Sequence, residues 1–251
     1  MGRDGMDQLQ GKTCLVTGAA GVVGEAISRR FAALGCRLVL VDLQADRLAS
    51  LAEEIGGAAL PMDVSDEVAV AAAIAGLGAP FAGGIDILVN NAGILSNNKA
   101  AATSAQEWRK VLAVNLDGAF YLAKACLPAM RAKRWGRVIN ICSLAMKTGG
   151  LTAGTAYTTS KSALGGLTFS LARETARDGI TVNGIAPAYV VTPMVTEQLT
   201  QEQRDQLLAA IPVGRFCEAS EVAHVAAFLA SPESGFITGE IIDINGGLHL
   251  D

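Results

Sequence analysis

Short apolar runs alternate along the chain with longer segments in which apolar residues recur every three or four positions. The short runs have the length of buried strands, and the longer segments have helical periodicity. The predicted strands, some with their exits, lie within 12–17, 36–42, 57–63, 85–93, 136–143, 179–187 and 239–247. Alternation of this kind predicts an α/β fold, a doubly wound parallel sheet with helices on both faces.

The helices predicted between these strands differ in regularity. Their ranges are 18–35, 43–56, 64–79 with Ser65 as a possible cap, 106–130, 157–177 and 218–231. A less regular segment at about 193–212, amphipathic from 195 onward, is expected to form a mobile lid over a substrate. No linker or internal repeat interrupts the series, so 1–251 is expected to be a single domain.

Composition and charge restrict the function. The 251 residues carry a net charge of −4 with both signs interspersed, which favours neither nucleic acid nor a membrane surface as partner. Five scattered cysteines without CxxC spacing predict neither disulfides nor a metal site, and they fit a reducing cytoplasm. The uncharged run 68–85 is interrupted by glycines and a proline, so we do not expect it to span a membrane.

The segment Ser143–Lys161 carries candidate catalytic chemistry. Tyr157 and Lys161 are four residues apart in a predicted helix, so they share one face. A nearby ammonium should lower the phenol pKa from about 10, which would make Tyr157 a general acid or base. Taken alone, the same spacing is also common on helix surfaces.

A glycine turn after the first strand is a candidate phosphate site. Gly18, Gly21 and Gly24 would let a pyrophosphate approach the following helix N-terminus. Asp42 lies 24 residues beyond Gly18, close to the spacing of a ribose-binding acid, although it could instead cap the next helix. Asn115, in the middle of a predicted helix, is either a satisfied core amide or a functional group.

Together these motifs resemble the short-chain dehydrogenase/reductase family from Thr17 to Gly247. The shared motifs are the glycine turn, Asp63-Val64, Asn90-Asn91-Ala92-Gly93, the helix Asn115, Ser143 with Tyr157 and Lys161, and the carboxyl-terminal Thr238-Gly239 with Asn245-Gly246-Gly247. The resemblance implies a Rossmann-type, seven-stranded sheet, a nicotinamide cofactor and a homotetramer.

The resemblance also assigns roles to residues. Ser143 would hold the substrate oxygen, Tyr157 would transfer the proton, Lys161 would lower the tyrosine pKa and bind the ribose, and Asn115 would hold a relay water. Cofactor-binding residues would be Gly18, Gly21, Val22, Val23, Gly24, Asp42, Leu43, Asp63, Val64, Asn90, Ala92, Gly93, Tyr157, Lys161, Pro187, Val190 and Thr192. No metal is implied.

Three departures from the family pattern concern the pocket. The middle glycine of the turn comes one position early, so that Val22 stands where glycine is usual. Ala188 replaces the usual glycine after Pro187. Ser143 precedes Tyr157 by fourteen residues, one more than expected, with the extra residue in the loop 147–154.

Three functions are weighed on these grounds. The first is an NAD-dependent dehydrogenase of a small secondary alcohol, such as a polyol or hydroxy acid, because Asp42 should repel the 2′-phosphate of NADP. The alternative is a 3-oxoacyl-carrier-protein reductase, although such members of the family mostly use NADPH and would want a basic patch, for which only Lys99, Lys147 and Arg215 are candidates. A non-catalytic NAD(H)-binding sensor or scaffold is a third possibility, and the intact set of catalytic residues speaks against it.

Overall fold

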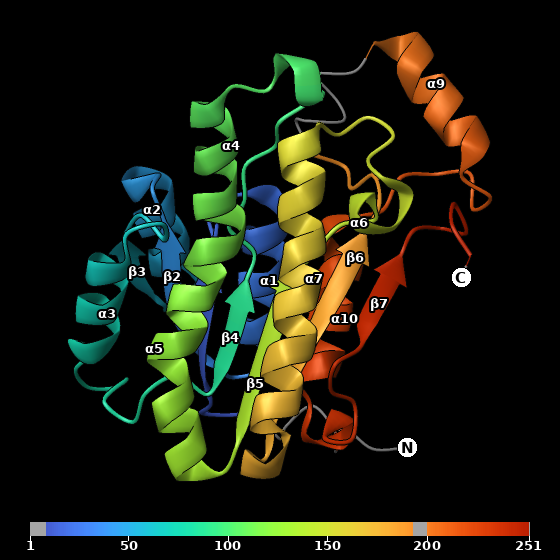
Figure 1. Ribbon diagram of the computed structural model, residues 1–251. Coiled ribbons are helices and arrows are strands. Elements are labelled where there is room, and N and C mark those ends of the chain that lie inside the picture. The colour runs from blue at the N-terminus through green and yellow to red at the C-terminus, as the bar shows by residue number, and fades with distance from the viewer. Residues whose placement is uncertain (1–8, 193–199, 251) are drawn as a thin grey trace, which may run out of the picture.

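The computed structural model describes residues 9–192 and 200–250. Seven parallel strands form one sheet in the order β3-β2-β1-β4-β5-β6-β7 (Figure 1). Their bounds are β1 Thr13–Thr17, β2 Arg37–Asp42, β3 Ala58–Pro61, β4 Ile87–Asn90, β5 Gly136–Ile141, β6 Ile180–Pro187 and β7 Ile241–Ile244. The winding direction reverses between β1 and β4, and open sheets of this class bind ligands at that point. The predicted fold class is therefore confirmed.

Helices cover both faces of the sheet (Figure 1). One layer packs its apolar side chains with Val16 and Ile139 of the strands, and the other packs with Leu15 and Val138, their chain neighbours. The first layer contains α1 Val22–Ala33, α2 Ala45–Ile55 and α10 Ala219–Ala230, and the second α3 Glu67–Ala75, α4 Ala105–Leu112, α5 Gly118–Lys133 and α7 Thr155–Thr175. Burial on both faces explains why the strands are continuous apolar runs.

The helix predicted at 64–79 is shorter than expected. α3 begins after Asp66, whose carboxylate accepts a hydrogen bond from the Ala69 amide at 2.9 Å. Ser65 is therefore not the cap, and its hydroxyl instead donates to Asp63 at 2.7 Å. An acidic N-cap is favoured because it satisfies an exposed amide of the first turn.

The helix predicted at 106–130 is interrupted. A π-helical segment, Ala113–Asp117, joins α4 to α5 and contains the buried Asn115. Gly118 follows, and a Cβ there would lie 2.8 Å from Val64 Cγ2 and 3.0 Å from the Val64 carbonyl oxygen. The glycine thus lets the exit of β3 pass directly against the helix. Single-turn π segments of this kind often occur at functional sites.

The combined helix Ala105–Lys133 has the length and composition of a membrane-spanning helix. In the part of the chain that the structure describes, it is the one helix long and apolar enough to cross a bilayer by length and composition. It packs on the sheet, however, and 44% of its most apolar window is buried inside the protein. Core helices pass the same test, so its length is weak evidence for a membrane.

The predicted lid falls partly outside the described residues, which exclude 193–199. Its second half forms α9, Gln201–Ala210. After α9 the chain returns to the end of β7, where the Val213 amide donates to the Gly246 carbonyl at 3.1 Å and Ile211 is buried. This segment is thus anchored at one end, and its mobility stays a prediction.

Candidate active site

The glycine turn joins β1 closely to α1. Gly18 has a φ of +62°, and a Cβ at Gly24 would lie 2.0 Å from the Gly18 carbonyl oxygen. Gly21 differs, because its φ is −81° and a Cβ there would lie 3.3 Å from the same oxygen. The backbone needs glycine at 18 and 24, whereas a Cβ at 21 would require a shift of only a few tenths of an ångström. The shifted middle glycine therefore leaves the turn geometry intact.

The N-terminus of α1 suits an anion. Gly21 occupies the cap position and, within the described chain, no side chain caps the helix. The amides of the first turn and the helix dipole are thus directed toward the space beyond the sheet. Val23, in this turn, lines the adjoining cavity, and Val22 is 37% exposed. These features fit the pyrophosphate of a dinucleotide.

Asp42, at the end of β2, is tied to the same turn. Its carboxylate accepts hydrogen bonds from the Ala20 amide and from the Gln44 amide, both at 3.0 Å. Gln44 holds the N-cap position of α2, so the interpretation of Asp42 as a cap is wrong. The carboxylate stands beside the glycine turn, where an adenosine ribose would lie in a dinucleotide fold. Leu43, which follows, is 70% exposed.

The exit of β4 uses its two asparagines differently. Asn90 is buried and donates to Asn140 of β5 at 2.8 Å, so its side chain lies within the sheet rather than in the cavity. Asn91 lines the cavity, and its side-chain NH₂ donates to the backbone carbonyls of Thr17 and Gly18 at 2.9 and 3.1 Å. The Thr17 hydroxyl in turn accepts from the backbone amides of Asn91 and Ala92. Asn91 holds the glycine turn and is absent from the predicted site residues.

The exit of β3 lies outside the main cavity. Asp63 is exposed and accepts from the amide and hydroxyl of Ser65, while Val64 is buried beneath Gly118. Neither lines the cavity. Their assignment to the adenine end stays a prediction.

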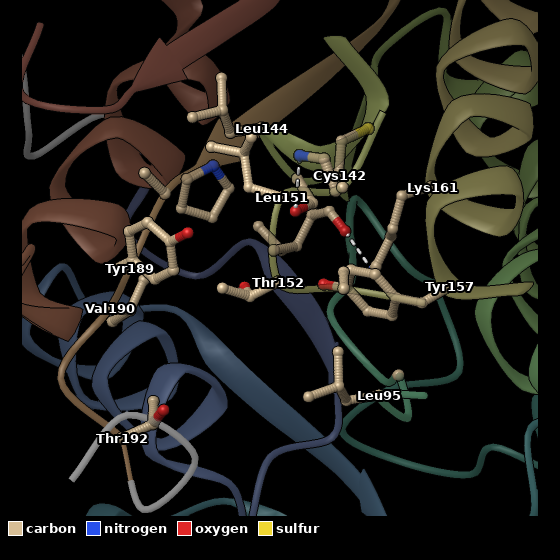
Figure 2. A pocket seen from close by; sticks show the side chains of 18 of the residues that line it. Leu95, Cys142, Leu144, Leu151, Thr152, Tyr157, Lys161, Tyr189, Val190 and Thr192 are labelled. Carbon is tan, nitrogen blue, oxygen red and sulfur yellow. Dashed lines mark hydrogen bonds between the residues drawn. The ribbon is translucent and has the colours of Figure 1, made fainter. Parts of the chain in front are cut away.

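A cavity of about 680 Å³ opens at the carboxyl ends of the strands (Figure 2). It collects eight of the predicted residues: Val23, Gly93, Ser143, Tyr157, Lys161, Pro187, Val190 and Thr192. Its remaining walls are mostly apolar and come largely from Ile94, Leu95, Leu144, Leu151, Ala153, Ala188 and Tyr189. In Figure 2 the rings of Tyr157 and Tyr189 face the cavity from two sides, with Thr152 between them in the view. The apolar walls depend on tertiary folding and carry no sequence motif.

The predicted catalytic groups converge in this cavity. Tyr157 and Lys161 lie one turn apart on α7, and the Lys161 Nζ is 5.9 Å from the centre of the tyrosine ring. The same ammonium donates to the Ile141 carbonyl at 2.7 Å, so it is held at the end of β5. Ser143 follows that strand and forms a hydrogen bond with Tyr157. Proton transfer and oxyanion binding can therefore act on one substrate oxygen.

Burial controls the charge of this pair. It raises the pKa of Tyr157 above the usual phenol value, and the hydrogen bond with Ser143 opposes this shift. The expected lowering of the Tyr157 pKa is thus wrong, because the loss of solvation on burial outweighs the hydrogen bond with Ser143. Burial also lowers the pKa of Lys161 to about 8. At neutral pH Tyr157 is accordingly a neutral phenol that can donate a proton.

Asn115 is fully used in positioning. Its side-chain oxygen accepts from the Ile94 amide at 2.8 Å, and its NH₂ donates to the Ile94 carbonyl and the Ser160 hydroxyl, both at 3.0 Å. Ser160 itself donates to the Tyr157 carbonyl at 2.7 Å. Asn115 thus joins the exit of β4 to the catalytic helix as a satisfied core amide. Its holding of a relay water stays a prediction.

The departure at Ala188 is accommodated. Among the described non-glycine residues, only Arg134 has a positive φ, so Ala188 needs no left-handed conformation. Its amide donates to the Ile244 carbonyl at 2.9 Å, and the residue lines the cavity. The methyl group therefore adds to the cavity wall without straining the loop. In the described chain no group of three or more His, Cys, Asp or Glu could hold a metal.

Comparison with known proteins identifies the family. A family model described as enoyl-(acyl carrier protein) reductase matches residues 18–249. The 3-oxoacyl-[acyl-carrier-protein] reductase FabG of Escherichia coli is 39% identical over 245 residues, covering 96% of this chain and 98% of that protein. The chain belongs to the short-chain dehydrogenase/reductase family. FabG of Pseudomonas aeruginosa is also 39% identical, over 253 residues, covering 96% and 99% of the two chains.

Solved structures of the family match the fold closely. A 3-oxoacyl-[acyl-carrier protein] reductase from Brucella melitensis superposes with a TM-score of 0.90 at 35% identity, covering 98% of this chain and 94% of that one. A putative NAD(P)-dependent gluconate 5-dehydrogenase from Beutenbergia cavernae, solved with bound NADP, has a TM-score of 0.90 at 36% identity, covering 97% and 99%. The protein is thus an oxidoreductase of the nicotinamide-dependent short-chain type, in which a nicotinamide cofactor, when bound, would supply or accept the hydride.

Proposed function

We propose that the protein uses NADH to reduce the ketone of an apolar substrate, with a 3-oxoacyl thioester as the first candidate. The observation that carries the proposal is the convergence of Ser143, Tyr157 and Lys161 on a cavity with mostly apolar walls. Ser143 binds the ketone oxygen, and Tyr157, kept neutral by burial, donates the proton to it. Lys161 stabilises the resulting phenolate.

The cavity favours an acyl substrate over the small polyol or hydroxy acid first considered. Among the described residues that line it, Lys161 is the sole charged side chain, so a substrate carboxylate would have no other cation to pair with. The curated relatives named above are also 3-oxoacyl reductases, which supports the alternative better than the small-alcohol reading. The match to a gluconate 5-dehydrogenase keeps a polyol as the second candidate.

Recognition of an acidic carrier protein has little support near the cavity. Lys147 forms an ion pair with Asp243 at 2.7 Å, and Arg215 donates two hydrogen bonds of 2.7 Å to Glu221. Lys99 donates to two backbone carbonyls. All three candidates for a basic patch have internal partners. The proposal therefore concerns the acyl group and does not include the carrier to which that group is attached.

The preference for NAD(H) rests on charge. Asp42 presents a carboxylate beside the turn, while Ala20 and Gly21 offer no basic side chain there for a 2′-phosphate. The Beutenbergia structure contains NADP, so this choice separates the present chain from that neighbour.

The proposal is tested by following the nicotinamide absorbance in four reactions. The purified protein is given an acetoacetyl thioester with NADH, the same thioester with NADPH, gluconate with NAD, and a cofactor-only blank. We expect turnover in the first reaction above all others. Oxidation of gluconate without reduction of the thioester would favour the polyol, and cofactor binding without any turnover would favour a sensor.

A further inference from the structure

The loop 149–154 forms one wall of the cavity, with Gly150, Leu151, Thr152 and Ala153 among the lining residues. Gly149 and Gly150 both have positive φ, near +76° and +77°, so the chain turns sharply before the tip Leu151–Thr152. Leu151 is 65% exposed although it lines the cavity. Figure 2 shows Leu151 and Thr152 projecting into the space that Tyr157 faces. The position of this tip therefore decides the shape offered to a substrate.

A single ammonium group fixes both ends of the tip. Lys99 Nζ donates to the Gly150 carbonyl at 2.9 Å and to the Ala153 carbonyl at 2.7 Å. These two carbonyls immediately flank Leu151 and Thr152. Charge-assisted hydrogen bonds are stronger than neutral ones, so one side chain bridges the two ends of the bend between the short helix Ala145–Thr148 and α7.

The segment that carries Lys99 is itself well anchored. The carbonyls of Ser96 and Asn98 accept from the amides of Gly154 and Thr155 at 2.7 and 3.0 Å. Glu107 of α4 accepts from the Ser96 hydroxyl and, at 2.9 Å, from the Asn98 amide, and these bonds lower the pKa of its carboxyl. The segment 96–99 is therefore a fixed support for the loop 149–154.

We propose that Lys99 is a specificity-determining positioning residue, which sets where Leu151 and Thr152 stand in the cavity. It acts through the loop and does not touch the substrate. The residue is exposed, but its ammonium already has these two internal acceptors. The effect on ketone selectivity rests on the proposed function, whereas the fixing of the loop does not.

Three variants test the proposal. Lys99→Met removes the donors while keeping the chain length, and Lys99→Arg keeps donors and charge. The matched control is Lys124→Met, since Lys124 is an exposed lysine of α5 paired with Glu67. Steady-state kinetics with a carrier-free acetoacetyl thioester and with a branched analogue give the substrate KM, and titration with NADH gives the cofactor affinity.

We expect Lys99→Met to raise the thioester KM by about tenfold, because both bonds that hold the loop tip are lost and the tip no longer keeps its place in the cavity. The preference for the straight over the branched substrate should narrow, and NADH affinity should not change. Lys99→Arg should recover part of the loss, and Lys124→Met should behave as the unmodified protein. An unchanged KM and selectivity in Lys99→Met would overturn the proposal.

A second readout does not depend on activity. Hydrogen exchange of the peptide spanning 149–155 should be faster in Lys99→Met than in Lys124→Met, with the core strands unchanged. Equal exchange in the two variants would contradict the role of Lys99 even if the protein reduced no ketone. If exchange were faster in Lys99→Met but the protein reduced no ketone, the role of Lys99 in holding the loop would stand and the proposed substrate class would be rejected. If Lys99→Met failed to fold, Lys99→Arg and Leu151→Ala would replace it, and unchanged selectivity in Leu151→Ala would overturn the proposal.

Discussion

The charge of Asp42 should decide between NAD and NADP. Its two carboxylate oxygens are held by separate amides, those of Ala20 and Gln44, so the group is fixed at the mouth of the glycine turn. A 2′-phosphate about 4 Å away would be repelled by about 4 kcal/mol at an effective dielectric of 20. Partial exposure and salt reduce this repulsion to about 2 to 3 kcal/mol. A difference of that size corresponds to a preference for NAD over NADP of about 30- to 150-fold.

Two substitutions separate charge from structure. Asp42→Ala removes the charge and both acceptors, whereas Asp42→Asn removes the charge and keeps one acceptor for the turn. If repulsion dominates, kcat/KM for NADPH should rise about tenfold or more in Asp42→Asn, while kcat/KM for NADH falls through weaker ribose binding. In Asp42→Ala the preference should narrow mainly because NADH is used less well, since both the ribose acceptor and the support of the turn are lost.

The assay is the ratio of kcat/KM for NADH to that for NADPH, at low and at high salt. A charge effect predicts that the ratio for the unmodified protein falls as salt rises. Equal or better use of NADPH by the unmodified protein would refute the electrostatic argument. Arg47 is the residue to check in that case, because it lies near this end of β2, 3.3 Å from the Gln44 side-chain oxygen.

Three further predictions concern pH, packing and assembly. Because burial lowers the pKa of Lys161 to about 8, kcat/KM for ketone reduction should be constant at neutral pH and fall above about pH 8, where the ammonium loses its proton; a profile falling below pH 7 would contradict this. Gly24→Ala should destabilise the protein by about 1 to 3 kcal/mol in urea unfolding, because its Cβ would meet the Gly18 carbonyl at 2.0 Å. Gly21→Ala should destabilise it less, because its Cβ would lie 3.3 Å from the same oxygen, and equal effects would reject the packing argument. Phe169, 52% exposed on α7, should lie in a subunit interface of a homotetramer, so Phe169→Glu should lower the mass found by sedimentation, and an unmodified monomer at micromolar concentration would exclude the interface.

Much of the fold could be predicted because its signals are local. The strands are short and largely apolar runs, and the turns after β1, β4 and β7 carry glycine or asparagine. The π segment around Asn115 could not be predicted, because it depends on bonds from the side chain to Ile94 and Ser160, remote in the chain. The boundary of α3 was misplaced because Ser65 and Asp66 are both good caps and only the backbone decides between them.

The candidate site was predictable only where spacing determines geometry. Tyr157 and Lys161 come together because a helix brings positions four apart onto one face. Their pKa values depend on burial, which has no sequence signal, and the predicted direction for Tyr157 was wrong for that reason. The support that Lys99 gives to the loop has no sequence signal, since its two acceptors lie 51 and 54 residues further along the chain.

The central claim is that Tyr157 donates the proton during NADH-dependent reduction of a ketone. Single-turnover reduction of an acetoacetyl thioester, compared between the unmodified protein and Tyr157→Phe, tests it most directly when NADH binding is measured in both. The claim predicts rapid loss of NADH absorbance in the unmodified protein and a rate lower by about a hundredfold or more in Tyr157→Phe, with NADH affinity nearly unchanged. A Tyr157→Phe variant that reduces the thioester at a substantial fraction of the unmodified rate would contradict it.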